Sequence, residues 1–227
     1  MASQGAREVL TRLSDSRIVP VVRVHSLTAA RLAMKALIDA GFRNAEITMT
    51  VPGAVDVIRQ LSNESDFLVG AGTVLDLRQA EASISAGARF VVSPVIVEGL
   101  ADLCREADVL SIMSGLSPNE VFAAWQKGSG AVKVFPARSM GGPGHIRSLK
   151  VVFPDVPLIP TGGVNIHNLA EYLRAGAAFV GVGGDLVNEE HIEQGQTDIV
   201  VELGRKYLES AQGTEKGGHE RCISKRS

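Results

Sequence analysis

Residues 18–49 read IVPVVRVHSLTAARLAMKALIDAGFRNAEITM, and this stretch holds one complete unit of the pattern that decides the fold. The apolar runs Ile18 to Val24 and Ala45 to Met49 predict two buried strands. Between them, the amphipathic segment Leu27 to Ala40 predicts a helix, and Gly41 follows it, the usual residue just past a helix end. The unit is therefore a strand, a helix and a second strand, a connection that favours parallel pairing.

The same alternation of short apolar runs and amphipathic segments occurs eight times along the chain. The predicted strands are Ile18 to Val24, Ala45 to Met49, Phe67 to Gly72, Phe90 to Pro94, Val109 to Ser114, Ala131 to Pro136, Leu158 to Gly163 and Phe179 to Gly184. Eight such units predict an α/β protein, a single (β/α)8 TIM barrel, and a leading helix before Ile18 is expected to plug its lower end. An open doubly wound sheet is the alternative, but Arg23-Val24-His25-Ser26 stands where its Gly-x-Gly-x-x-Gly turn would follow the first strand.

The composition predicts one barrel domain over residues 1–211, followed by a polar, glycine-rich tail over residues 212–227 that is expected to be disordered. With 45% hydrophobic and 21% charged residues, the chain has the balance of a soluble globular protein. A net charge of -2 provides no electrostatic reason to expect nucleic acid or an anionic membrane as a partner. The first residues lack the basic-then-apolar order of a secretory signal, so we expect a cytoplasmic protein.

The cysteines and histidines do not form a recognisable metal-binding pattern. Cys104 and Cys222 are the two cysteines; the first is expected to pack in the core and the second lies in the polar tail. His25, His145 and His167 are scattered along the chain. A barrel that uses a divalent metal with phosphate substrates therefore has little support, and we predict no metal and no cofactor.

Several polar residues fall at the carboxyl ends of the predicted strands, where such barrels form their sites. They are Arg23 after the first strand, Glu46 in the second, Thr73 after the third, Ser93 before Pro94 at the end of the fourth and Lys133 in the sixth. A carboxylate and an amine at inward-facing positions of neighbouring strands would be an uncompensated cost in a core. We therefore expect Glu46 and Lys133 to face each other or a ligand.

Lys133 lies in the middle of the apolar run Ala131-Val132-Lys133-Val134-Phe135-Pro136-Ala137. A lysine in a buried strand loses water around its ammonium group, which favours the neutral amine. A neutral amine is a nucleophile that forms a Schiff base with a carbonyl substrate. The alternative is a lysine on an edge strand whose ammonium group reaches the surface.

Two glycine pairs follow the last two strands: Gly162-Gly163 after Thr161, and Gly183-Gly184 before Asp185. The loops after strands seven and eight of these barrels often hold a phosphate with backbone N–H groups, and glycine lets the backbone approach the anion. The alternative is that the glycines only make tight turns. Asp185 opposes phosphate binding if its carboxylate points into the loop, and it would serve equally well as a helix cap.

Six segments in order resemble the class I 2-keto-3-deoxy-6-phosphogluconate aldolases, also called 4-hydroxy-2-oxoglutarate aldolases. They are Ala-Glu46-Ile-Thr-Met, Gly70-Ala-Gly-Thr-Val-Leu, Val-Ser-Pro94, Lys133-Val-Phe-Pro-Ala, Pro160-Thr-Gly-Gly-Val and Gly-Val-Gly-Gly184. The resemblance extends from about Arg7 to Leu208. It implies a carbon–carbon lyase that cleaves a 2-keto-3-deoxy sugar acid phosphate to pyruvate and glyceraldehyde 3-phosphate, without metal, in a homotrimer of barrels.

The resemblance also implies roles for individual residues. Lys133 matches the Schiff-base lysine, Glu46 the general acid/base, and Thr73 a threonine that binds the pyruvate carboxylate. The glycines Gly162, Gly163, Gly183 and Gly184 match the phosphate-binding loops. Pro94, Phe135 and Thr161 lie in the matched segments and are predicted to line the substrate site.

Two departures from the commoner pattern of the family concern anion binding. Many members carry an arginine four residues after the glutamate, where this chain has Thr50, and a serine in the last loop, where it has Gly184. Arg23 is expected to supply the missing charge, as in relatives that act on the galactonate epimer. The phosphogluconate, the phosphogalactonate, 4-hydroxy-2-oxoglutarate and an unphosphorylated keto acid all remain candidate substrates, and a non-catalytic phosphate-binding barrel remains the alternative function.

Overall fold

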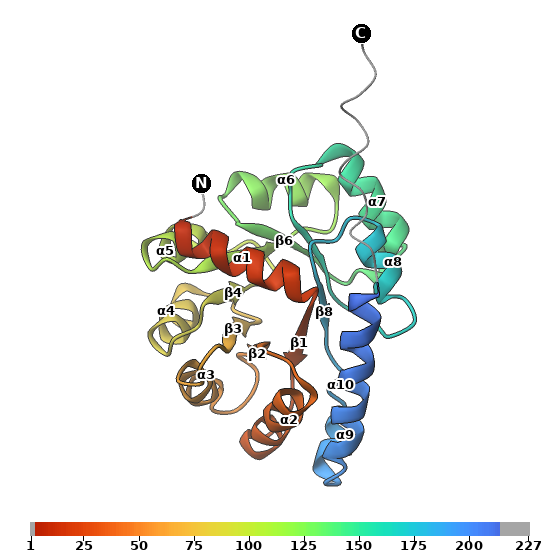
Figure 1. Ribbon diagram of the computed structural model, residues 1–227. Helices are drawn as coiled ribbons and strands as arrows, with labels where there is room; N and C mark the ends of the chain where they lie inside the picture. Colours follow the sequence, from red (N-terminus) through yellow and green to blue (C-terminus); the bar gives the residue numbers. More distant parts are fainter. Residues whose placement is uncertain (1–2, 214–227) are drawn as a thin grey trace.

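The computed structural model describes residues 3–213, which form a (β/α)8 barrel (Figure 1). The parallel strands are β1 Ile18–Val22, β2 Asn44–Thr48, β3 Leu68–Gly72, β4 Phe90–Val92, β5 Leu110–Ser114, β6 Ala131–Val134, β7 Leu158–Pro160 and β8 Val180–Val182. They pair in the order β7-β6-β5-β4-β3-β2-β1-β8, and a bridge between Thr161 and Gly181 joins the two ends of the sheet. The predicted fold class is confirmed.

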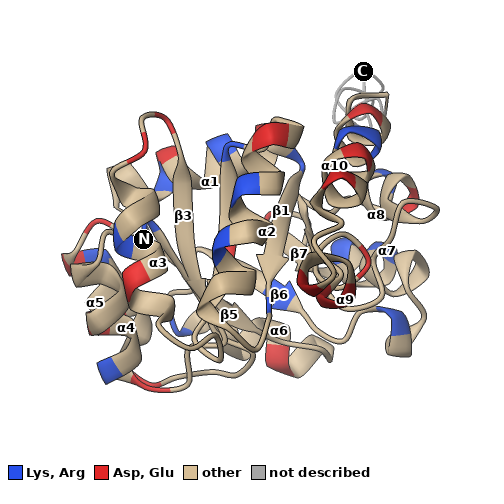
Figure 2. Cartoon of the chain, turned by 90° about the horizontal axis from the view of Figure 1, so that it is seen from below, with Lys and Arg blue, Asp and Glu red and all other residues tan. Residues whose placement is uncertain are grey.

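Each strand is followed by a helix on the outside of the barrel. The helices are α1 Gln4–Ser16, α2 Leu27–Ala40, α3 Ala54–Ser62, α4 Leu77–Ser85, α5 Leu100–Glu106, α6 Pro118–Gln126, α7 Pro143–Val152, α8 Leu169–Arg174, α9 Glu189–Glu193 and α10 Thr197–Gln212, with a short 3-10 helix η1 at Arg138–Met140. Charged residues lie mainly on these helices and their loops, and the strands are almost free of them (Figure 2). Within residues 3–213, no helix combines the length and the apolar character needed to cross a membrane.

Local sequence signals explain where these helices begin and end. The predicted helix Leu27 to Ala40 is confirmed as α2: the Ser26 side chain accepts a hydrogen bond from the backbone of Ala29, and Gly41 ends the helix at φ 110°. Asp76 caps α4 in the same way as Ser26 caps α2.

Several strands end earlier than predicted. The first strand ends at Val22 rather than Val24 and the fourth at Val92 rather than Pro94. The sixth and eighth also stop two residues short and the seventh three, so that Arg23, Pro94 and both glycine pairs lie in loops. Apolar runs continue past the last ladder hydrogen bond because the loops after the strands are themselves partly buried. Gly162, at φ 87°, also cannot continue a regular ladder.

Helix α1 closes the amino-terminal end of the barrel, as the sequence predicted, and it crosses that end in Figure 1. Its apolar residues Ala6, Val9 and Leu13 are buried in a cluster with inward-facing residues of the strands, among them Phe90 and Ile112. The Asp108 carboxylate, just before β5, accepts a hydrogen bond from the Gly5 backbone at 2.9 Å and anchors the start of the helix.

Truncating the fully buried Leu13 to alanine is expected to destabilise the protein by about 2–5 kcal/mol, because it leaves a cavity between α1 and the strands. Urea unfolding of the wild type and the variant measures this difference. Leu10→Ala is the matched control on the same helix; since Leu10 is only partly buried, its loss should be smaller. If Leu13→Ala lost no more unfolding free energy than Leu10→Ala, the role of α1 as a plug that stabilises the barrel would be contradicted.

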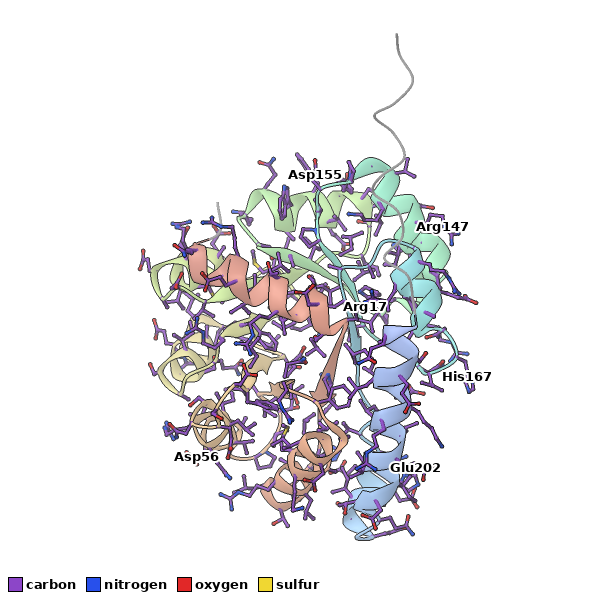
Figure 3. All side chains as sticks on the ribbon, viewed as in Figure 1. Arg17, Asp56, Arg147, Asp155, His167 and Glu202 are labelled. Atoms are coloured by element: carbon purple, nitrogen blue, oxygen red, sulfur yellow. The ribbon has the colours of Figure 1, made fainter. Side chains whose placement is uncertain are left out.

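Helix α10 packs along α2 and ends beside the start of β1 (Figure 1). The Arg17 side chain, at the junction of α1 and β1 (Figure 3), donates a hydrogen bond to the carbonyl of Ala211 at 2.6 Å. The helix runs through Gln212, the first residue of the predicted tail, and the domain boundary stays a prediction. From residue 214 onward, the predicted tail lies outside the described residues.

Candidate active site

Lys133 on β6 and Glu46 on β2 face each other inside the barrel. Their side chains are only 4% and 5% exposed, and Lys133 Nζ lies 3.9 Å from Glu46 Oε1. We expected them on neighbouring strands, which is wrong: three strands, β3, β4 and β5, separate β2 from β6 in the sheet. The two groups meet because closure of the barrel brings inward-facing residues of opposite walls together.

A glycine on the adjacent strand makes room for the Glu46 carboxylate. A Cβ built on Gly72 would lie 1.9 Å from Glu46 Oε1, so no larger residue fits without moving the carboxylate. This oxygen is buried and has no hydrogen-bond partner among the residues that the structure describes. A buried carboxylate oxygen left unpaired is an acceptor available to a bound molecule.

Arg23 and Thr73 form a polar pair above Glu46. Arg23 follows β1 and Thr73 follows β3, and Arg23 Nη2 donates to Thr73 Oγ1 at 2.8 Å across the end of β2. Thr73 adopts φ 56°, a conformation that residues with a side chain rarely take. Thr50 does not join this pair, because its hydroxyl bonds to the Thr48 hydroxyl at 2.9 Å.

A cavity of about 320 Å³ opens at the carboxyl ends of the strands, with Lys133 in its lining. It is also lined by all nine residues predicted to bind substrate: Arg23, Thr73, Pro94, Phe135, Thr161, Gly162, Gly163, Gly183 and Gly184. The Phe135 ring lies beside the amine, with its centroid 5.3 Å from Lys133 Nζ. The structure thus brings the predicted residues together around one space, while their roles stay predictions.

The two glycine pairs differ in what they require. Gly162 and Gly163 adopt φ 87° and 79°, and a Cβ on Gly163 would lie 2.4 Å from Arg138 Cβ, so glycine is needed at both positions. Gly183 and Gly184 have ordinary φ values, and a Cβ on Gly184 would meet open space. A serine side chain would therefore fit at position 184, so space does not explain why this chain has glycine there.

The cavity lining contains three residues that the sequence did not assign to the site: Val21, Val164 and Asp185. From the sequence, Asp185 was considered as a residue that would oppose phosphate or, equally well, as a helix cap. Val21 was hidden in a uniformly apolar strand, since every residue of β1 is buried and the burial pattern does not separate inner from outer positions.

The histidines lie apart from one another. His25 bonds to Glu189 at 2.6 Å and His145 to the carbonyl of Leu116 at 2.7 Å, while His167 is exposed. Among residues 3–213, no group of three or more His, Cys, Asp or Glu side chains could hold a metal ion. Independence of metal stays a prediction, which a chelator would test.

An amine that lines a cavity at the carboxyl end of a (β/α)8 barrel, with a buried carboxylate 3.9 Å from it, is the layout of a barrel enzyme. The family model for KDPG and KHG aldolase matches residues 9–203. The chain therefore belongs to the KDPG and KHG aldolase family, and it is an aldolase, a lyase.

Individual relatives agree along almost the whole chain. A 2-dehydro-3-deoxy-phosphogluconate aldolase of Pseudomonas aeruginosa is 32% identical over 91% of this chain and 94% of its own length. The KHG/KDPG aldolase of Escherichia coli is also 32% identical, over 88% of this chain and 94% of its own. Among solved structures, a KDPG aldolase from Legionella pneumophila, with pyruvate captured as a covalent carbinolamine, superposes with a TM-score of 0.76 at 30% identity, covering 89% of this chain and 97% of that one.

Proposed function

We propose that this protein is a class I aldolase that cleaves a 2-keto-3-deoxy sugar acid through a Schiff base on Lys133. The observation that carries the proposal is the buried pair of Lys133 and Glu46: Lys133 lines the cavity, and the Glu46 carboxylate lies 3.9 Å from its amine. A facing amine and carboxylate supply the nucleophile and the proton-transfer group that such a cleavage needs.

In the proposed reaction, Lys133 Nζ adds to the keto carbon, and the resulting carbinolamine loses water to form an iminium ion. Glu46 then takes the proton of the C4 hydroxyl. The C3–C4 bond breaks, its electron pair moves toward the iminium nitrogen to form an enamine, and the aldehyde leaves. Protonation of the enamine carbon by the Glu46 acid and addition of water release pyruvate and the free amine.

The lining of the cavity suggests how the substrate is oriented. Arg23 and Thr73, already joined at 2.8 Å, form a site for the keto-acid carboxylate. The aldehyde half then extends toward the loops after β7 and β8, where the four glycines lie. Pro94, Phe135 and Thr161 form the walls around the reacting carbons.

The names of the relatives suggest 2-keto-3-deoxy-6-phosphogluconate as the first substrate to try and 4-hydroxy-2-oxoglutarate as the second. The galactonate epimer of the first is added from the family resemblance. With the phosphorylated sugar acids the products would be pyruvate and glyceraldehyde 3-phosphate. Cofactor independence, a homotrimer and a cytoplasmic location remain predictions from the sequence and the family resemblance.

Trapping of the Schiff base tests the proposal directly. The protein is incubated with pyruvate and borohydride, which reduces an imine to a stable amine, and the adduct is located by peptide mass spectrometry. We expect one adduct, on Lys133, also in the presence of a metal chelator. A folded protein without an adduct, or with the adduct on another lysine, would refute the Schiff-base assignment.

Arg23→Met is expected to raise KM for the keto acid about 10- to 100-fold with a smaller change in kcat, because a hydrogen bond to a charged group contributes about 1.5–3 kcal/mol. Steady-state kinetics of pyruvate release measure both constants. Arg31→Met removes an exposed arginine of α2 and serves as the matched control. An unchanged KM in the Arg23 variant would exclude the proposed carboxylate site.

A further inference from the structure

The two ends of the cavity differ in charge. At one end, Arg23 supplies a guanidinium group that is directed toward Thr73. At the other end, Asp185 follows Gly183 and Gly184 and lines the cavity beside the loop after β7. The end where a phosphate would lie therefore carries a carboxylate.

The negative charge of Asp185 acts on the side chain of Tyr207, which lies on α10. Tyr207 hydrogen-bonds to the backbone of Ile166 in the loop after β7, and its pKa is raised first by burial and then by the negative charge of Asp185. Asp185 itself is exposed, and it lines the cavity next to Gly184. Asp185 has no ion-pair partner among residues 3–213.

The segment that follows strengthens the negative charge. Glu189, Glu190 and Glu193 lie on α9, which is mostly red in Figure 2. His25 is paired with Glu189 at 2.6 Å, so it is not available to a ligand without breaking this contact. The entrance beside β8 therefore carries several carboxylates over nine residues.

Basic groups near the loop after β7 do not offset this charge inside the cavity. The aliphatic stem of Arg138 packs at Gly163, but Arg138 is exposed and does not line the cavity. Its positive charge lowers the pKa of Tyr172 on α8, which burial raises. His167 is exposed and lies at the outer edge of the molecule in Figure 3. The cations in the lining are Arg23 and Lys133, which the proposed reaction already uses.

The end of the cavity near Asp185 contains both hydrogen-bond donors and a hydrogen-bond acceptor. Within the part of the chain that the structure describes, the backbone N–H groups of Gly163 and Gly184 donate no hydrogen bond, so they can donate to a ligand. The Asp185 carboxylate only accepts. Hydroxyl groups satisfy both, because they accept from N–H and donate to a carboxylate, whereas a phosphate dianion only accepts and is repelled by Asp185.

We propose that the aldehyde half of the substrate ends in neutral hydroxyl groups, not in a phosphate or a carboxylate, and that Asp185 selects for it. The inference rests on the proposed function of the same cavity. The substrate class is then an unphosphorylated 2-keto-3-deoxy sugar acid, cleaved to pyruvate and a neutral hydroxyaldehyde such as glyceraldehyde.

The test compares kcat/KM for 2-keto-3-deoxygluconate and for its 6-phosphate ester in the wild type, Asp185→Asn and Glu190→Gln. Asparagine keeps the shape of the aspartate and removes its charge, and Glu190 is an exposed residue of α9 outside the cavity lining. We expect the wild type to prefer the unphosphorylated acid by about 10-fold or more. Asp185→Asn should raise kcat/KM for the phosphate ester about 10-fold, and Glu190→Gln should leave the ratio of the two substrates within about twofold.

A wild type that prefers the phosphate ester, with the same preference in Asp185→Asn, would overturn the inference while leaving the aldolase proposal intact. Equal effects of Asp185→Asn and Glu190→Gln would also overturn it, since they would indicate a general field and not a contact in the cavity. Failure of the proposed function is recognised separately, because pyruvate and borohydride would then leave no adduct on Lys133; that result would remove this inference as well.

Discussion

Replacing Lys133 by methionine is expected to abolish cleavage of every keto-acid substrate and to eliminate the borohydride-trapped pyruvate adduct. Methionine fills a similar volume at this buried position but has no amine, so the covalent path through an iminium ion is closed. Pyruvate release measured over hours, and mass spectrometry of the intact protein, give two independent readouts. Turnover in the variant should fall below detection.

The control for this variant is Lys127→Met, which removes an exposed lysine paired with Glu98 at 2.8 Å. It should keep wild-type activity. Because Lys133→Met leaves the Glu46 carboxyl buried without an amine beside it, a thermal melt must establish that the variant is folded. Substantial cleavage by folded Lys133→Met would show that another group carries the reaction.

Glu46→Gln is expected to lower kcat about 10²- to 10⁴-fold, the usual contribution of a positioned general acid or base. Glutamine has nearly the same shape, and it can neither take the proton of the C4 hydroxyl nor return one to the enamine. The pyruvate adduct on Lys133 should still form, although more slowly, because the amine is retained. Rates of adduct formation and of aldol cleavage, measured on the same preparation, separate the two steps.

Glu98→Gln, at an exposed position in the pair with Lys127, is the matched control and should have no effect on kcat. A Glu46→Gln variant that cleaves at the wild-type rate would assign the proton transfers to another group or to water. Loss of adduct formation and cleavage by the same factor would instead indicate that Glu46 acts mainly in the carbinolamine step.

The sequence predicted the fold class because its signals are local. The spacing of apolar residues in Leu27 to Ala40, the serine before this helix and Gly41 after it all act within a few neighbours in the chain. Repetition of the unit then favoured a barrel. Strand ends were the weak point, since buried apolar residues such as Val24 after β1 and Ala137 after β6 continue the apolar runs beyond the strands.

The candidate site was predictable as a set of residues and not as an arrangement. Barrels form their sites at the carboxyl ends of the strands, so Arg23, Thr73 and Lys133 could be selected from their positions along the chain. The sequence could not predict which of these side chains would face each other. The opposition of β2 and β6 is a property of the closed sheet, and no local pattern encodes which strands face each other across it.

The amino-acid sequence by itself determined the alternation of strands and helices, the plug helix and the identity of the residues at the strand ends, because these depend on short-range periodicity, caps and glycines. Only the tertiary structure decided that Lys133 lies 3.9 Å from Glu46, that Gly72 leaves space for this carboxylate, and that Asp185 lines the cavity near Tyr207. Each of these contacts joins residues that are far apart in the chain. They exist because closing the sheet brings opposite walls of the barrel, and the loops that follow its strands, close to one another.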